Sequence, residues 1–287
     1  MIPTGFRRLA RREKCRVCGH RSWCLTASDS LDRVLCQRVE SPIRWRCGWL
    51  HGSANRVRGP RVVRLDDPPS FEEMERVARD GYLRLCERSE IRGPLAQHLG
   101  VSVEALDALR VGLRGESVFT WPMRDHLARV IGVRIRDDAS GTKFAVRGSR
   151  NGLFLPRIDE RELVIACEGE TDTAAALSLD FYAIGRPGCS GGTELFLRWL
   201  RRRAMRDVVV VADSDGPGIQ GAYELVDALS AHARSVRVVI GPRGWKDLRQ
   251  AVRSGYTRDD LLQDIETAMP VQPSIRVRGR EQIGGLL

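Results

Sequence analysis

Two groups of acidic residues each follow a short apolar run, and their positions predict a metal site. The residues are Glu168, Glu170 and Asp172 after the first run, and Asp213 and Asp215 after the second. Short runs rich in β-branched residues are typical of buried strands in a parallel sheet, and ligands bind beyond the carboxyl ends of such strands. Carboxylates gathered in one crevice repel one another, and a bound divalent cation relieves that repulsion. The sequence therefore predicts a Mg²⁺ or Mn²⁺ site.

Helix capping is the alternative role for acidic residues that follow strands. Thr171 and Asp172 could serve as caps, but capping does not account for Glu168 or for the later pair of aspartates. Asp247, which follows a fourth apolar run beside Lys246, is equally compatible with a cap and with the metal site.

Alternating strands and helices are expected to position these residues. Apolar runs alternate with helical stretches, which predicts a βαβαβαβα domain with a parallel sheet. The predicted strands are 162–167, 181–185, 207–212 and 235–240, and the predicted helices are 171–180, 193–205, 218–232 and 246–254. Glycines at 185, 188, 191 and 192 make the loop after the second strand permissive, so its backbone could approach a phosphate or a metal closely.

The acidic groups, the glycine-rich loop and the Lys246-Asp247 pair resemble the TOPRIM domain shared by bacterial-type primases, topoisomerases and some nucleases. The resemblance covers roughly 90 residues, with every acidic position filled. It implies that Glu168 is catalytic and that Glu168, Asp213 and Asp215 bind Mg²⁺ or Mn²⁺. It also implies that Asp172 and Asp247 assist in binding the metal.

A basic strand precedes this domain. Alternation in 130–136 places Arg134 and Arg136 on one face of a strand and apolar side chains on the other. The order of motifs from 119 to 156 resembles the small subdomain that precedes TOPRIM in bacterial primases. That resemblance implies a catalytic role for Lys143 and a nucleic-acid contact by Arg134 or Arg136. Taken alone, these residues are also compatible with the polar face of a small sheet.

The lysines are unusually placed. Of 47 basic residues only three are lysine, and two of these, Lys143 and Lys246, lie in the motifs just described. Because an ammonium group differs in geometry from a guanidinium fork, a retained lysine suggests a specific contact with nucleotide or nucleic acid.

The amino-terminal region predicts a zinc ribbon. Five of the eight cysteines lie in the first 50 residues, and Cys15 and Cys18 have the spacing of a zinc knuckle. Segments 22–27 and 33–38 are expected to form two paired strands, which makes Cys24 and Cys36 neighbours on one face. The four cysteines would then bind one structural Zn²⁺. Because this spacing departs from two Cys-x-x-Cys knuckles, one ligand could be replaced, and the candidates are His20, Cys47 and His51.

Nearly all of the net positive charge lies in this ribbon. Residues 1–58 contain 13 Lys and Arg and 4 Asp and Glu, a net charge of +9, whereas the whole chain carries +10. Basic residues with interleaved tryptophans, among them Trp23, suit phosphates and unstacked bases, which makes single-stranded DNA the preferred partner. The alternative is a solvated basic arm with tryptophans packed around the metal.

The length of 287 residues fits several modules. No apolar run of about 18 residues or more suggests a membrane span, and no secretory leader is found, so a cytoplasmic location is expected. The expected fold class is α/β, and the expected divisions are a zinc ribbon (1–58), a linker (59–70), a helical then β subdomain (71–157), the TOPRIM domain (158–268) and a tail (269–287).

The first functional hypothesis is a primase-type nucleotidyltransferase that makes short RNA primers from nucleoside triphosphates on single-stranded DNA. The sequence after Asp247 is shorter than in bacterial replicative primases, which favours a phage, plasmid or mobile-element type, with any replicative helicase on another chain. The alternatives are a Mg²⁺-dependent TOPRIM nuclease, which would use water as the nucleophile, and a zinc-dependent single-strand DNA-binding adaptor with an inactive TOPRIM domain.

Overall fold

The computed structural model describes residues 5–10, 13–19, 24–29, 33–39, 41, 43–45, 48–52, 70–203 and 206–271. The chain divides into two compact units, Met1–Asp66 and Asp67–Leu287, here called the ribbon unit and the main unit. Each is described by itself. Most of the predicted linker and most of the predicted tail lie outside the described residues.

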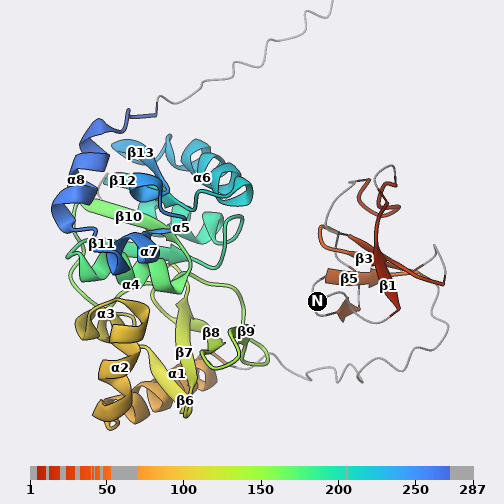
Figure 1. Ribbon diagram of the computed structural model, residues 1–287, viewed down its shortest axis with the longest axis horizontal. Coiled ribbons are helices and arrows are strands. Elements are labelled where there is room, and N and C mark those ends of the chain that lie inside the picture. Colours follow the sequence, from red (N-terminus) through yellow and green to blue (C-terminus); the bar gives the residue numbers. More distant parts are fainter. Residues whose placement is uncertain are drawn as a thin grey trace, which may run out of the picture. The chain divides into compact units, whose positions relative to one another are not determined.

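The ribbon unit is built on a five-stranded antiparallel sheet with the order β1-β2-β3-β5-β4 (Figure 1). The strands are β1 (Phe6–Arg8), β2 (Leu25–Ala27), β3 (Val34–Cys36), β4 (Arg44–Trp45) and β5 (Gly48–His51). Leu25 pairs with Leu35 in the β2–β3 register, so Cys24, just before β2, lies across from Cys36 at the end of β3. The predicted cross-strand placement of these two cysteines is therefore confirmed.

The main unit begins with three helices and an antiparallel sheet. The helices are α1 (Phe71–Cys86), α2 (Ser89–Leu99) and α3 (Val103–Ala108), and the sheet has the order β6 (Gly112–Gly115), β7 (Val118–Arg124), β8 (Val130–Asp137) and β9 (Thr142–Ala145). Gly100 ends α2 in the left-handed conformation at φ 71°, and the Ser102 hydroxyl caps α3 by accepting from Ala105 N–H.

The sequence pattern predicts helix from 71 to 112, but the last helix of this part ends at Ala108 and Gly112 begins strand β6. A Cβ at Gly112 would lie only 2.4 Å from the carbonyl carbon of Gly81 in α1. The small residue thus lets the strand and the helix pack closely, a tertiary requirement that helix periodicity does not reveal.

The predicted α/β domain follows. Its four parallel strands have the order β11-β10-β12-β13, with bounds β10 (Leu163–Glu168), β11 (Tyr182–Arg186), β12 (Asp207–Ala212) and β13 (Ser235–Ile240). The helices are α4 (Glu170–Ser178), α5 (Thr193–Arg201), α6 (Gly216–Leu229), α7 (Leu248–Arg253) and α8 (Arg258–Thr267), with a short 3₁₀ turn, η1 (Pro242–Gly244). The fold class is the one that the sequence predicts.

The helices cover both faces of the parallel sheet (Figure 1). Alternate strand residues face opposite sides: Ile165 and Val209 pack with α4, α7 and α8, whereas Val164 and Val210 pack with α5 and α6. The first of these two cores continues into α2, α3 and β7, so the two parts of the main unit share one hydrophobic core. Residues contributed by both parts can therefore form one site.

Two helix predictions needed correction. Helix α5 ends at Arg201 rather than near 205, and α8 has no counterpart among the predicted helices. Few residues of the sequence indicate this helix. The Thr257 hydroxyl and the Asp260 carboxylate form a capping box, and Leu261 and Ile265 provide a narrow buried stripe.

Within the described residues, no helix combines the length and the apolar character needed to cross a bilayer.

Candidate active site and cysteine cluster

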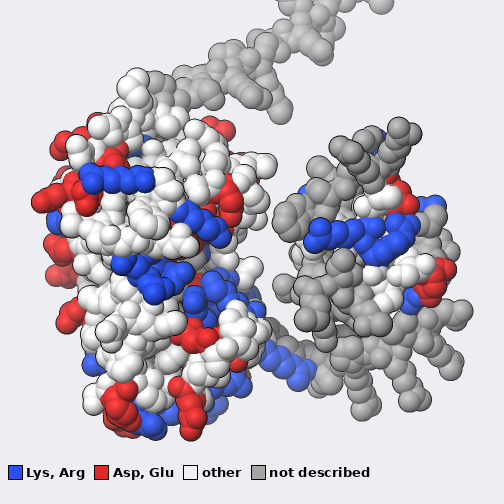
Figure 2. Space-filling view, in the orientation of Figure 1, with Lys and Arg blue, Asp and Glu red and all other residues white. Residues whose placement is uncertain are grey.

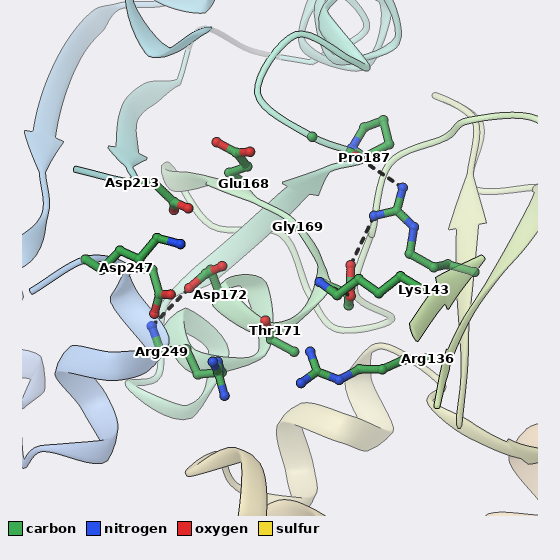
Figure 3. A pocket seen from close by; sticks show the side chains of 14 residues that line it. Arg136, Lys143, Glu168, Gly169, Thr171, Asp172, Pro187, Asp213, Asp247 and Arg249 are labelled. Carbon is green, nitrogen blue, oxygen red and sulfur yellow. Dashed lines mark hydrogen bonds and ion pairs between the residues drawn. The ribbon is translucent and has the colours of Figure 1, made fainter. Parts of the chain in front are cut away.

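Five carboxylates line one pocket of about 390 Å³ at the carboxyl edge of the parallel sheet, and four of them come from different elements (Figure 3). Glu168 ends β10, Asp213 follows β12, Asp172 lies in the first turn of α4 and Asp247 precedes α7. Parallel strands end at the same edge, which is why residues far apart in sequence meet here.

The turn between β10 and α4 depends on a glycine. Gly169 has a φ of 96° and is the N-cap of α4, a conformation that side-chain-bearing residues rarely adopt. This turn places Glu168 and Asp172 on the same pocket, and α4 has no side-chain cap. Asp172 therefore does not cap its own helix; its carboxylate instead accepts from Arg249 N–H at 3.0 Å.

Two further predicted ligands have capping roles. The Asp247 carboxylate accepts from Gln250 N–H at 2.7 Å and also lines the pocket, so both of its predicted roles are compatible with its position. The Asp215 carboxylate accepts from Gly218 N–H at 3.0 Å as the N-cap of α6, lies 3.9 Å from Lys246 Nζ, and is outside the pocket lining.

Burial and mutual repulsion raise the pKa of three of the pocket carboxyl groups, those of Asp172, Asp213 and Glu168. Burial raises the pKa of Asp172 to about 8, and the charge of Asp247 contributes in the same direction. Burial likewise raises the pKa of Asp213 to about 7, with Glu168 the next cause. Burial also raises the pKa of Glu168, although Arg186, its cross-strand neighbour on β11, opposes the shift.

These carboxylates suit a divalent cation in their chemistry, because they are hard oxygen donors whose repulsion a cation would relieve. They are nevertheless more widely spread than a single coordination sphere. Among the described residues, the group of metal-binding side chains whose ligand atoms all lie within 4.8 Å of one another is the set of four cysteines, not the carboxylates.

The opposite side of the pocket is basic. Arg136 on β8 and Lys143 on β9 are direct cross-strand partners, and Arg134 lies on the same face of β8. Lys246 and Arg249 contribute further cations next to the carboxylates. Figure 2 shows Lys and Arg side chains gathered near the middle of the main unit, with Asp and Glu side chains beside them. The pocket thus has an acidic half and a basic half.

Glu170 belongs to the first acidic group, but the sequence did not indicate its partners. Its side chain is fully buried, and it lies between two of the predicted basic residues. Arg134 Nη1 lies 3.2 Å from one carboxylate oxygen and Lys143 Nζ lies 3.0 Å from the other. Burial alone would raise the pKa of Glu170, but Lys143 and Arg134 outweigh it and lower the pKa below its usual value. No local signal distinguishes Glu170 from an ordinary first-turn glutamate.

The ribbon unit brings together the four predicted cysteines. The sulfur atoms of Cys15, Cys18, Cys24 and Cys36 all lie within 4.8 Å of one another. The Cys18–Cys24 sulfurs are 3.6 Å apart and the Cys24–Cys36 sulfurs 3.9 Å apart. A tetrahedral Zn²⁺ with Zn–S bonds of about 2.3 Å requires sulfurs roughly 3.8 Å apart, so the spacing fits zinc.

The surroundings of the sulfurs also fit a metal thiolate. Backbone N–H groups of Arg38 and Val39 point at Cys36 Sγ, at 3.4 and 3.3 Å. Such donors stabilise thiolate charge. Burial raises the pKa of Cys24 to about 12 in the absence of a metal, so zinc binding would have to displace its proton.

The alternative fourth ligands have different positions. His51 on β5 is not in the cysteine group, and its ring Nε2 lies 3.0 Å from the Val39 carbonyl oxygen. His20 and Cys47 lie outside the described residues, as does Trp23. Of the basic residues in the ribbon unit, Arg7 is paired with Glu13 at 2.8 Å, whereas Arg8 is exposed at the end of β1.

Comparisons with known proteins support the fold. No protein-family model matches the chain, and no curated protein matches it in sequence. Solved structures do match. A DnaG catalytic core aligns at a TM-score of 0.56 and 17% identity, covering 70% of this chain and 80% of its own. A DnaG primase catalytic domain bound to single-stranded DNA aligns at a TM-score of 0.55 and 17% identity, and the alignment covers 70% of this chain and 81% of that one.

The Aquifex aeolicus primase, in a structure comprising zinc-binding and RNA polymerase domains, aligns at a TM-score of 0.56 and 16% identity, covering 71% of this chain and 63% of its own. The resemblance to DnaG-type primases is therefore confirmed at the level of the fold.

Proposed function

We propose that this chain is a primase-type nucleotidyltransferase that makes short RNA primers on single-stranded DNA. The observation that carries the proposal is the two-sided pocket, in which carboxylates of the parallel-sheet part face cations of the antiparallel-sheet part. Phosphoryl transfer from a triphosphate needs both groups, because metal-binding carboxylates and phosphate-binding cations act on the same substrate.

The acidic half would hold the divalent cations. Glu168, Asp213, Asp172 and Asp247 line it, and Asp215 lies beside it at the start of α6. Bound Mg²⁺ or Mn²⁺ would neutralise charge on the transferred phosphoryl group and lower the pKa of the attacking 3′-hydroxyl. Capping of α6 and α7 by Asp215 and Asp247 fixes the backbone of both loops, so the chain itself orients the two carboxylates.

The basic half would bind the triphosphate. Arg136 and Lys143 present neighbouring cations from β8 and β9, and Lys246 and Arg249 extend the positive charge toward the carboxylates. Arg136 donates through Nε to Asp138 at 2.6 Å, which fixes its guanidinium and leaves the two terminal nitrogens for phosphate oxygens.

The ribbon would hold the template. The net charge of +9 on residues 1–58 suits a phosphate backbone, and the likeness to a DnaG catalytic domain bound to single-stranded DNA supports that choice of partner.

One incubation tests the proposal against its alternatives. The full chain is mixed with single-stranded DNA, labelled nucleoside triphosphates and Mg²⁺, and the products are separated by size. Short labelled RNA that depends on all three components is the expected product, and Asp213→Asn should abolish it. Shortened DNA without incorporated label would instead identify a nuclease, and binding without either product would identify an adaptor.

A further inference from the structure

Glu170 joins the two parts of the main unit at the pocket. It is the first residue of α4 in the parallel-sheet part, and its side chain is fully buried. Its two partners, Arg134 and Lys143, come from β8 and β9 of the antiparallel sheet. Burying an ionised carboxylate costs desolvation free energy, which neighbouring cations must offset. The charges of Glu170, Arg134 and Lys143 are therefore interdependent.

The two cations differ in how much they are constrained. Arg134 is held on three sides: Nη1 donates to Glu170, Nη2 donates to the Pro187 carbonyl oxygen at 2.9 Å, and the guanidinium lies 5.2 Å from the centre of the Phe154 ring. Its side chain is only 17% exposed. Arg134 therefore serves mainly to connect β8 to the parallel-sheet part.

Lys143 is the partner that remains able to contact a ligand. Its side chain is 50% exposed, and its ammonium forms an ion pair with Glu170. An ammonium group has three N–H donors, so the Glu170 contact leaves donors directed to the pocket. The same contact restrains a long side chain that would otherwise sample many rotamers.

We propose that Glu170 is a positioning residue, which holds Lys143 over the pocket so that its ammonium binds the triphosphate of the substrate. This inference rests on the proposed function and deepens it. Arg134 contacts the carboxylate oxygen of Glu170 that Lys143 does not, and it fixes the carboxylate relative to β8. Lys143 is then held by a carboxylate that does not itself move. The arrangement has the logic of a lysine that is held by a glutamate while it binds phosphate.

The opposite role is a competing anion, in which Glu170 occupies Lys143 until phosphate displaces it. Complete burial argues against that role, because the carboxylate cannot leave its cations for solvent without moving α4. The two roles predict opposite effects of removing the charge of Glu170. If Glu170 positions Lys143, the loss of its charge weakens phosphate binding; if Glu170 competes with phosphate, the loss strengthens phosphate binding.

A double-mutant cycle distinguishes these outcomes. The full-length wild type, Glu170→Gln, Lys143→Met and the double variant are titrated calorimetrically with inorganic tripolyphosphate in saturating Mg²⁺. We expect Glu170→Gln to weaken binding about tenfold, as for the loss of one charge-assisted contact. Lys143→Met should weaken binding at least as much, and the double variant should bind no more weakly than Lys143→Met alone.

Matched variants control for charge and folding. Glu194, an exposed glutamate paired with Arg198 on α5, provides Glu194→Gln, which should bind as the wild type does. Glu170→Asp retains the charge with a shorter side chain and should lose less affinity than Glu170→Gln, which keeps the inference testable if Glu170→Gln folds poorly. In primer synthesis, Glu170→Gln should raise KM for the triphosphate more than it lowers kcat.

Additive losses in the cycle, tighter binding by Glu170→Gln, or a wild type that does not bind tripolyphosphate would each overturn the inference. Failure of the proposed function is a separate result. If the wild type binds tripolyphosphate with the expected coupling but makes no primers, Glu170 positions Lys143 for a different phosphate substrate.

Discussion

The two candidate metal centres are built in opposite ways. The cysteine sulfurs come from a short stretch of chain, are mostly buried and lie close enough together to coordinate one metal ion. The pocket carboxylates come from the ends of separate elements over 80 residues and are more widely spread. The ribbon unit has a small apolar core around its sulfurs, whereas the main unit has two extensive cores. If both sites bind metal as proposed, the contrast predicts a metal that is required for folding in the ribbon unit and an exchangeable metal in the main unit.

The largest expected effect concerns the ribbon unit. Cys36→Ser should release zinc and unfold residues 1–66, because structural zinc supplies roughly 10–16 kcal/mol of apparent binding free energy to such small modules. Metal analysis should find about one zinc per chain in the wild type. Circular dichroism and proteolysis should show that the main unit stays folded.

Cys86, a partly buried thiol in α1, provides the matched control, since Cys86→Ser should retain the zinc. Retention of zinc by Cys36→Ser together with its loss from Cys47→Ser would show that the ligand set is different.

The next effect concerns the main unit. Asp213→Asn should reduce Mg²⁺-dependent primer synthesis by at least about a hundredfold, since the amide keeps the size of the side chain but not its charge. Removing one of several crowded carboxylates should leave thermal stability in the absence of Mg²⁺ unchanged or higher. Asp207→Asn, at the opposite end of the same strand, should retain activity. If Asp213→Asn unfolds instead, the carboxylate is structural and the contrast between the two centres fails.

A smaller effect is expected on the salt dependence of DNA binding, and it tells the contributions of the two units apart. Deleting residues 1–58 should flatten the dependence of single-strand affinity on salt, because nearly all net positive charge lies there. If the ribbon contacts about three phosphates, the logarithmic slope should change by about two. Fluorescence anisotropy titrations at low and moderate salt concentrations measure this slope. An unchanged slope would place the main binding surface on the face that carries Arg134, Arg136 and Lys143.

The smallest effect is a pH dependence of stability. Asp172 and Asp213 have pKa values raised to about 8 and about 7, well above their usual range. The folded protein therefore retains protons that the unfolded chain releases above about pH 4, so the stability that these two groups contribute should fall as pH rises from about 4 to about 8. Urea unfolding of the main unit without Mg²⁺ measures this trend, and Asp172→Asn should reduce it.

The surface residue Asp180, whose pKa Arg161 lowers by a side-chain hydrogen bond, supplies the comparison. Asp180→Asn should leave the trend between about pH 5 and about pH 8 unchanged, because the Asp180 carboxylate stays ionised throughout that range. Added Mg²⁺ should suppress it in the wild type, because a bound cation competes with the protons. A flat profile in the wild type would mean that the carboxylates are less crowded than their positions indicate.

Local chemistry explains what could be predicted from the sequence. The β-branched runs before Glu168 and Asp213 have few alternatives to buried strands, so the four strands of the parallel sheet lie within a residue or two of their predicted bounds. The Cys15–Cys18 spacing and the β2–β3 pairing are equally local, which is why the four cysteines that the sequence grouped together do lie close to one another.

Tertiary structure decided the rest. It placed Asp215 at a helix cap outside the pocket lining and gave Asp247 both a capping contact and a place in the pocket. It also brought Glu170 into contact with Arg134, 36 residues earlier in the chain. The sequence determined the strands and the kinds of donor that they carry, because those depend on neighbouring residues. Which charges pair depended on how the antiparallel sheet packs against α4, and that contact between distant segments has no signature in local spacing.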